Sequence, residues 1–214
     1  MANPARTGSR VETHSLTPDG QRGYSAIELV IVTSIVIILA GITIYSLTAG
    51  KKAYAADDEA TQLVSFFREA YHRALAQRQT MRVTIDRNQG VVRLMDEGAM
   101  PGGDEVEIIR GRVSQHINMD RPAIGGTPIA VPPSPYNYNP AVFDNGVWSA
   151  RFRADGSVVD AAGNSLSATL YFSPIGLTED NAGLIRAVTL FGPSGSVRFW
   201  KYDISADTFV TEAK

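Results

Sequence analysis

An unbroken run of 22 residues without a charged side chain, residues 29–50, constrains this chain more than any other feature. A helix of that length is about 33 Å long, enough to cross a hydrocarbon layer of about 30 Å. Averages over the whole chain hide the run, because the mean hydropathy is −0.06 and the net charge is −2 over 214 residues. The sequence therefore predicts an apolar N-terminal helix joined to a polar domain of ordinary composition.

Residues 1–23 form a polar leader that contains two prolines, three glycines and a side-chain charge of +1. The leader and the apolar run could form a secretory signal peptide cut before Ala56, although the run exceeds the usual length of about 7–15 residues. A simple membrane anchor is a second interpretation. Neither interpretation explains Glu28, which comes one residue before the run. The three leader arginines and Lys51-Lys52 nearly balance, so the charges alone leave the orientation open.

The stretch Gly23-Tyr24-Ser25-Ala26-Ile27-Glu28-Leu29-Val30 resembles the type IV prepilin signature. In that family a membrane aspartic peptidase cuts after the glycine and methylates the new amine. The resemblance thus implies cleavage between Gly23 and Tyr24 and N-methylation of Tyr24, where the family more often has Phe. It also implies that Glu28 pairs with the amine of a neighbouring subunit during filament assembly, since a carboxylate inside a membrane usually needs a partner. A Glu28 side chain that reaches the membrane interface is the alternative.

The helix is expected to continue beyond the apolar run, because residues 51–79 contain neither Gly nor Pro. Apolar residues recur there every three or four positions, at Ala56, Ala60, Leu63, Phe67, Ala70, Tyr71, Ala74 and Leu75. We therefore predict one helix from about Tyr24 to Gln79, apolar all round in its first half and amphipathic in its second. Gly41 is unfavourable inside a helix, and two interpretations remain open. The pilin resemblance implies a helix that can loosen here on assembly, and the alternative is close helix packing.

The remaining chain shows the alternation and turn residues of antiparallel strands. Residues 81–86 and 91–95 predict a hairpin, which we prefer to a calcium loop formed by Asp86, Asn88 and Glu97 because Gly90 is displaced by one position. Further strands are expected within 105–119 and at 147–152, 157–160, 166–172, 184–191 and 196–202. The proline-rich segment 120–141 is interpreted as a surface loop, either a simple connection or a contact with a neighbouring subunit.

Two later motifs are similar to those of the GspH/FimT family of minor pseudopilins and minor pilins. Phe152-Arg153-Ala154-Asp155-Gly156 resembles its F-x-x-D/N-G turn, and Gly195-Ser196-Val197-Arg198 resembles its closing G-x-x-R strand. The resemblance implies an α+β, type IV pilin-like fold, with the long N-terminal helix packed on antiparallel β-sheets. The domains would be a leader (1–23), a membrane and filament-core helix (24–50) and a periplasmic head (51–214).

No enzyme is expected, because we find no nucleophile elbow, phosphate loop or histidine pair with ligand spacing. The chain has no cysteine, and no metal or cofactor is implied. The resemblance implies a minor pseudopilin near the tip of a type II secretion pseudopilus. Its partners would be prepilin peptidase, other pseudopilins or pilins, the inner-membrane assembly platform, and lipid before assembly. The location would be the Gram-negative inner membrane, with a cytoplasmic N-terminus, and then the filament.

The alternative is a FimT-type minor pilin of a type IV pilus, active in pilus assembly or in DNA uptake. Basic and aromatic residues interleave near the end of the chain, at Arg198, Trp200, Lys201 and Tyr202, as in a base-stacking platform. The competing interpretation is an edge strand with Val197 and Phe199 inward and Arg198, Trp200 and Tyr202 outward. A side-chain charge of −3 after residue 23 favours the edge strand.

Overall fold

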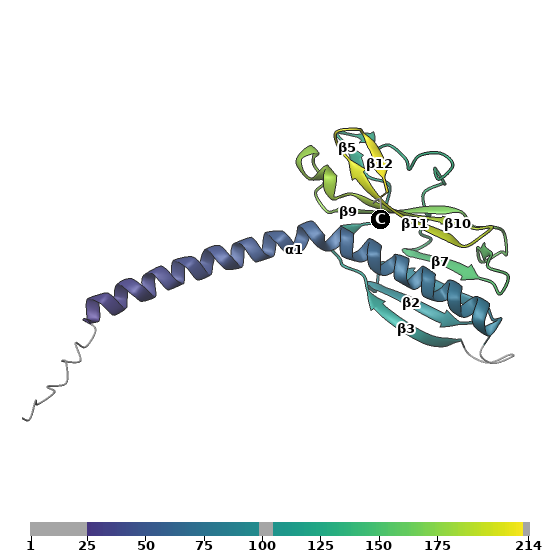
Figure 1. Ribbon diagram of the computed structural model, residues 1–214, viewed down its shortest axis with the longest axis horizontal. Coiled ribbons are helices and arrows are strands. Elements are labelled where there is room, and N and C mark those ends of the chain that lie inside the picture. Colours follow the sequence, from purple (N-terminus) through teal and green to yellow (C-terminus); the bar gives the residue numbers. More distant parts are fainter. Residues whose placement is uncertain (1–24, 99–104, 212–214) are drawn as a thin grey trace, which may run out of the picture. The chain divides into compact units, whose positions relative to one another are not determined.

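The computed structural model describes residues 25–98 and 105–211, except for the side chains of residues 44–53. The chain divides into two compact units, residues 1–45 and residues 46–214. A single helix, α1 (Ala26–Gln77), begins in the first unit and ends in the second, and every described strand belongs to the second (Figure 1). The fold class is thus α+β, with antiparallel sheets and an apolar N-terminal helix.

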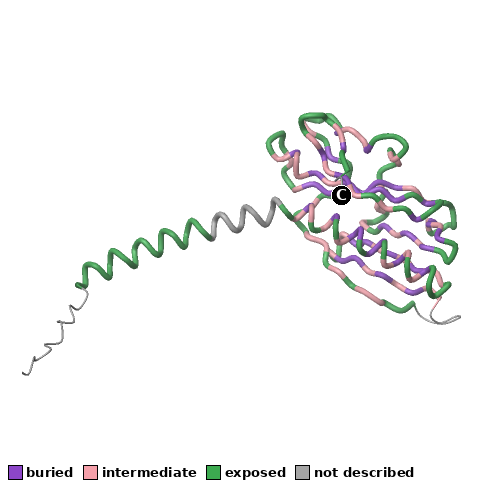
Figure 2. Tube along the Cα trace, viewed as in Figure 1, coloured by how far each residue is buried: buried purple, intermediate pink, exposed green. Residues whose placement is uncertain are grey.

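The second half of α1 is amphipathic, as the three-to-four spacing predicts. Six residues of the predicted apolar stripe are less than 5% exposed: Ala56, Ala60, Leu63, Phe67, Ala70 and Ala74. Leu75, at the end of the stripe, is 39% exposed. The helix ends one residue before Arg78, whose φ of 56° lies in the left-handed region that commonly terminates helices. Figure 2 shows buried positions recurring along this part of the helix.

The first sheet has the strand order β3-β2-β1-β7-β8. The predicted hairpin is confirmed, because β1 and β2 pair from Met81↔Asp96 to Asp86↔Val91. Met81, Val83 and Ile85 on β1 are buried, while Arg82 and Thr84 alternate with them on the outer face. The five strands are β1 (Met81–Asp86), β2 (Val91–Asp96), β3 (Val106–Arg112), β7 (Val147–Phe152) and β8 (Val158–Val159).

The second sheet has the order β12-β11-β10-β9-β4, and the short strands β5 and β6 pair with each other. A 3-10 helix, η1 (Glu179–Leu184), precedes β10, so the expected strand at 184–191 begins two residues later. β12, which pairs with residues 201–203, was not predicted from the sequence. These strands are β4 (Ile117–Asn118), β5 (Ala123–Ile124), β6 (Thr127–Pro128), β9 (Ala168–Pro174), β10 (Arg186–Phe191), β11 (Ser196–Asp203) and β12 (Thr208–Val210).

The main core of the second unit joins α1 to both sheets. Phe67 on α1 is fully buried, and its ring centroid lies 5.9 Å from that of Trp148 and 5.8 Å from that of Phe152. Leu170 on β9 and Leu190 on β10 belong to the same buried cluster. The amphipathic half of α1 is therefore held by side chains that come from widely separated parts of the sequence.

A second, smaller core covers the other face of the second sheet. Its residues show that two of the predictions are wrong. Trp200 and Tyr202 are 3% and 8% exposed and pack with Tyr171 and Phe209. The expectation of an edge strand with Trp200 and Tyr202 outward is therefore wrong, and the strand that contains them, β11, pairs with β10 on one side and β12 on the other. The interpretation of residues 120–141 as surface alone is also wrong, because Ile129 is 4% exposed and belongs to this cluster. The proline-rich segment thus supplies apolar cover for a sheet that is apolar on both faces.

Candidate functional site at the start of the N-terminal helix

Glu28 lies in the first turn of α1 and caps the helix from within the same chain. Its Oε2 accepts a hydrogen bond of 2.9 Å from the backbone N–H of Ser25, and the Ser25 hydroxyl accepts one of 3.4 Å from the N–H of Ile27. Ser25-Ala26-Ile27-Glu28 is therefore a variant of the capping box, in which the glutamate accepts from the N–H of the serine and the serine accepts from the N–H of the second helical residue rather than the third. We did not predict this motif, although S-x-x-E before an apolar run is its usual signal.

The described side chains in the apolar part of α1, up to Thr43, are exposed. The window Ala26–Thr43 has a mean hydropathy of 2.5 and no buried residue (Figure 2). Exposed Ile and Leu side chains at this density favour a lipid layer or other apolar helices as surroundings. By length and composition this window is long enough to cross a membrane.

The hydroxyl groups within this window are satisfied by the helix itself. The hydroxyl of Thr33 donates to the carbonyl of Leu29 at 2.8 Å, and that of Ser34 donates to the carbonyl of Val30 at 2.7 Å. Thr43 donates in the same way to Leu39 at 2.8 Å. Because hydrocarbon offers no hydrogen-bond partner, this local pairing makes the hydroxyls compatible with a membrane.

Two predicted site residues, Gly23 and Tyr24, lie outside the described residues. Gly41 is described, and a Cβ added there would meet no atom within 4 Å. Close packing inside the chain therefore gives no reason for this glycine.

The two motifs of the head meet at one tyrosine of α1. A Cβ added at Gly195 would lie 2.6 Å from Cδ2 of Tyr71 and 2.8 Å from the carbonyl oxygen of Gly156. A Cβ at Gly156 would lie 3.3 Å from Cε2 of Tyr71. Both glycines have positive φ, 84° for Gly156 and 63° for Gly195. The two turns therefore need glycine for backbone conformation and for close approach to the helix.

Asp155 supports the first of these turns. Its carboxylate accepts hydrogen bonds from the Ser157 hydroxyl at 2.6 Å and from the Ser157 backbone N–H at 2.9 Å. These bonds, led by the hydroxyl, lower the pKa of Asp155 below its ordinary value. The aspartate acts here as a turn residue.

The predicted DNA-contact residues are divided between two environments. The Trp200 indole N–H donates to the Thr189 hydroxyl at 3.0 Å, and the Tyr202 hydroxyl donates to Asp207. Arg198 is exposed, but its guanidinium carbon lies 4.3 Å from the centroid of the Tyr136 ring. Lys201 is half-buried. Because Trp200 and Tyr202 are buried, these four residues do not form an open stacking platform.

The residues that mimic a calcium loop are each held by other protein groups. Asp86 accepts from the backbone N–H of Gln89 at 3.0 Å, and the Asn88 amide donates to the carbonyl of Asn145 at 2.7 Å. Glu97 forms an ion pair with Arg151 at 2.8 Å. In the described part of the chain, no group of three or more His, Cys, Asp or Glu side chains is placed to hold a metal ion.

No family model matches the chain, and no curated protein or solved structure matches it significantly.

Proposed function

We propose that this chain is a minor pseudopilin, a structural subunit at or near the tip of a type II secretion pseudopilus. The observation that carries the proposal is a contrast within α1. The window Ala26–Thr43 is apolar, has no buried residue and has Glu28 in its first turn, whereas the second half of the helix is buried against two sheets. The exposed half needs lipid before assembly and other helices after it. The buried half fixes a folded head to that anchor.

The carboxylate of Glu28 supports a role in subunit pairing. Glutamine would accept the hydrogen bond from Ser25 equally well and would carry no charge into an apolar environment. A carboxylate is therefore useful where a cation comes close, and the amine created by cleavage before Tyr24 is such a cation. In this proposal the leader 1–23 is cytoplasmic, the head is periplasmic, and Tyr24 is the methylated N-terminus.

The first experiment tests processing. The full chain is expressed with a prepilin peptidase, and the mature N-terminus is identified by mass spectrometry. We expect a protein that begins with methylated Tyr24, and we expect Gly23→Ala to remain uncut. A product that begins at Ala56 would identify a secretory signal peptide and overturn the proposal.

The second experiment separates the two roles of Glu28. Glu28→Gln keeps the helix cap and removes the charge, whereas Glu28→Ala removes both. We expect both variants to be processed normally and both to be lost from sheared filaments. Incorporation of the Gln variant at the wild-type level would mean that capping alone matters and would remove the pairing argument.

The burial of Trp200 and Tyr202 weakens the alternative, a DNA-binding minor pilin. A gel shift of the full chain in detergent, at low and at moderate salt, tests it directly. Salt-dependent retardation of DNA would revive the alternative. Retardation that disappears in Arg198→Gln would identify Arg198 as a contact.

A further inference from the structure

The first sheet ends in a strand with a free edge. Strand β3 (Val106–Arg112) pairs with β2 on one side, and no described strand pairs with its other side. Figure 1 shows β3 at the margin of the sheet. Among the edge strands in the described part of the chain, β3 is the longest, with seven residues, whereas the others have two or three. Such an edge leaves backbone donors and acceptors available to a further strand.

The backbone groups at this free edge belong to two arginines. The N–H of Val113 donates to the carbonyl of Gly90 at 2.8 Å, and β2 and β3 keep one register from there back to Arg110. Hydrogen-bonded and non-hydrogen-bonded positions alternate in an antiparallel pair. The N–H and C=O groups of Arg110 and Arg112 therefore point away from β2, toward the free edge. A bulge at Ile108 interrupts the strand before these two residues, so the regular part of the edge is its C-terminal half.

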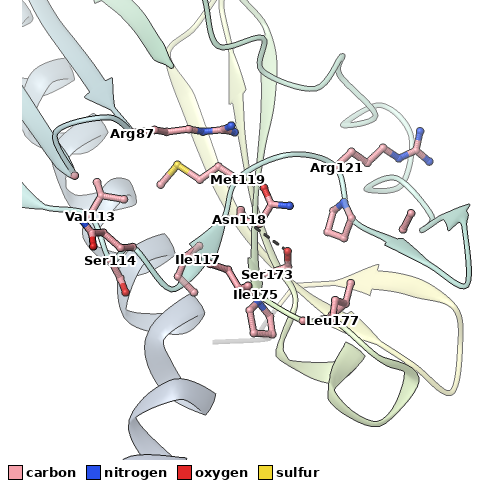
Figure 3. A pocket seen from close by; sticks show the side chains of 16 residues that line it. Arg87, Val113, Ser114, Ile117, Asn118, Met119, Arg121, Ser173, Ile175 and Leu177 are labelled. Carbon is pink, nitrogen blue, oxygen red and sulfur yellow. Dashed lines mark hydrogen bonds between the residues drawn. The ribbon is translucent and has the colours of Figure 1, made fainter. Parts of the chain in front are cut away.

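The helix α1 holds this half of β3 in place. A Cβ added at Gly111 would lie 2.6 Å from the amide nitrogen of Gln62, so the strand backbone lies against the helix. Directly after β3, the N–H of Ser114 donates to Glu59 of α1 at 2.6 Å. Figure 3 shows Val113 and Ser114 beside the helix, at the wall of a neighbouring cavity. An edge that is already fixed in this way loses little conformational freedom when it binds a partner.

The side chains of Arg110 and Arg112 lack a counter-charge. Both residues are exposed, and they lie two positions apart, on one face of the strand. Arg93, directly opposite Arg110 on β2, forms an ion pair with Glu107 at 3.4 Å. Among the described residues, no carboxylate forms an ion pair with Arg110 or Arg112. Because like charges directly opposite each other destabilise a sheet, acidic side chains next to these arginines would be favourable.

We propose that the free edge of β3 binds an extended segment of a partner protein that carries two acidic residues at alternate positions. The segment adds antiparallel to β3, and its acidic residues lie opposite Arg110 and Arg112 and exchange backbone hydrogen bonds with them. Charged side chains on an edge oppose pairing with strands in general, so the two arginines select for the complementary charge. A second copy of this chain fits less well, because the two glutamates of its own β3 segment are already ion-paired within the chain. The proposal does not depend on filament membership, so its test is separate from the processing experiment.

The test uses the full chain in a non-ionic detergent and a fluorescein-labelled peptide, Thr-Val-Glu-Val-Glu-Val-Thr. Two N-methylated forms keep its charge and side chains. The first is methylated on the backbone nitrogens of the two glutamates, whose N–H groups face β3 in the proposed pairing, and the second on those of the two valines that follow them, whose N–H groups face away. Fluorescence anisotropy is expected to show about tenfold weaker binding of the first form and a change of less than about twofold for the second.

Variants of the chain test the charges. Arg110→Gln combined with Arg112→Gln should weaken binding of the unmethylated peptide about fivefold. Arg153→Gln combined with Arg198→Gln removes the same charge from exposed residues elsewhere in the head and should change binding less than about twofold. Equal effects of the two methylation patterns, equal losses in the two double variants, or no binding of the unmethylated peptide at about 1 mM would overturn the proposal. A dimer in sedimentation velocity that is lost in the Arg110 and Arg112 double variant would assign the edge to a second copy and also overturn it.

Discussion

The contact of Gly195 with Tyr71 leads to a sharp prediction about the stability of the head. Gly195→Ala places a Cβ 2.6 Å from the Tyr71 ring and 2.8 Å from the Gly156 carbonyl oxygen, at a φ of 63°. The left-handed backbone costs alanine about 1 kcal/mol or somewhat more. Overpacking against a ring and a backbone oxygen adds about 1–3 kcal/mol. The expected loss in the free energy of unfolding is therefore about 2–4 kcal/mol.

Gly125 provides the matched control. Its φ of 57° is close to that of Gly195, but a Cβ added there meets no atom within 4 Å. Gly125→Ala therefore carries the backbone cost alone, about 1 kcal/mol. The difference between the two variants isolates the steric contact of the motif turns with α1.

The assay uses the two tryptophans of the chain, both in the head and at most 5% exposed. Urea unfolding of the full chain in detergent is followed by tryptophan fluorescence. With a slope of about 2 kcal/mol per molar urea, the steric contact should lower the midpoint of Gly195→Ala about 0.5–1.5 M below that of Gly125→Ala. Equal midpoints would refute the reasoning, because they would mean that Tyr71 and the Gly156 carbonyl do not crowd Gly195.

Two further predictions concern the links within the second unit. Arg186→Met should cost about 1–3 kcal/mol in urea unfolding, because the Arg186 side chain is 11% exposed and donates to Asp57 on α1 at 2.6 Å. Arg73→Gln, in a partly exposed helix pair with Glu69, should cost about 0.5 kcal/mol or less. Equal costs for the two variants would contradict the link between Arg186 and α1. The hydrogen bond to Asp207, with burial, raises the pKa of Tyr202 from 10.0 to about 12, so the protonated phenol stabilises the fold below pH 10 and this stabilisation is lost as the pH rises from 10 to 12. Tyr202→Phe should remove that part of the alkaline loss in thermal unfolding, and an unchanged pH profile would contradict it.

The helix and the first sheet could be predicted because their patterns are local. The three-to-four spacing of Ala56, Ala60, Leu63 and Phe67 indicates one buried helix face, and the alternation in residues 81–86 indicates a strand with one buried face. Each pattern can be recognised within its own segment, without knowledge of the rest of the chain. The observed boundaries differ from the predicted ones by one or two residues, because α1 ends at Gln77 rather than Gln79 and β2 ends at Asp96 rather than at residue 95.

The second sheet could not be predicted to the same depth, because β11 is apolar on both faces. Val197 and Phe199 pack toward the main core, and Trp200 and Tyr202 pack toward the second cluster. Such a strand needs a cover on each side, and nothing in its own sequence identifies the second cover. That cover includes Ile129, which is far away in the chain and lies in a segment whose prolines indicate a loop.

The meeting of Tyr71 with Gly156 and Gly195 could not be predicted from the sequence for a related reason. Each glycine indicates a turn by itself, and Tyr71 looks like one more member of an apolar stripe. Three segments have to be placed together before their shared contact exists.

The capping box sharpens the meaning of Glu28. Capping explains why an acceptor stands three residues after Ser25, and it contributes about 1 kcal/mol. It does not explain a charge, because glutamine caps as well and avoids the cost of a carboxylate in lipid, which reaches about 2.5–3.5 kcal/mol at the membrane centre. Capping therefore offsets only part of that cost. In the proposed filament, the amine of a neighbouring subunit would offset the remainder, and this difference between Glu and Gln is what the comparison of Glu28→Gln with Glu28→Ala tests.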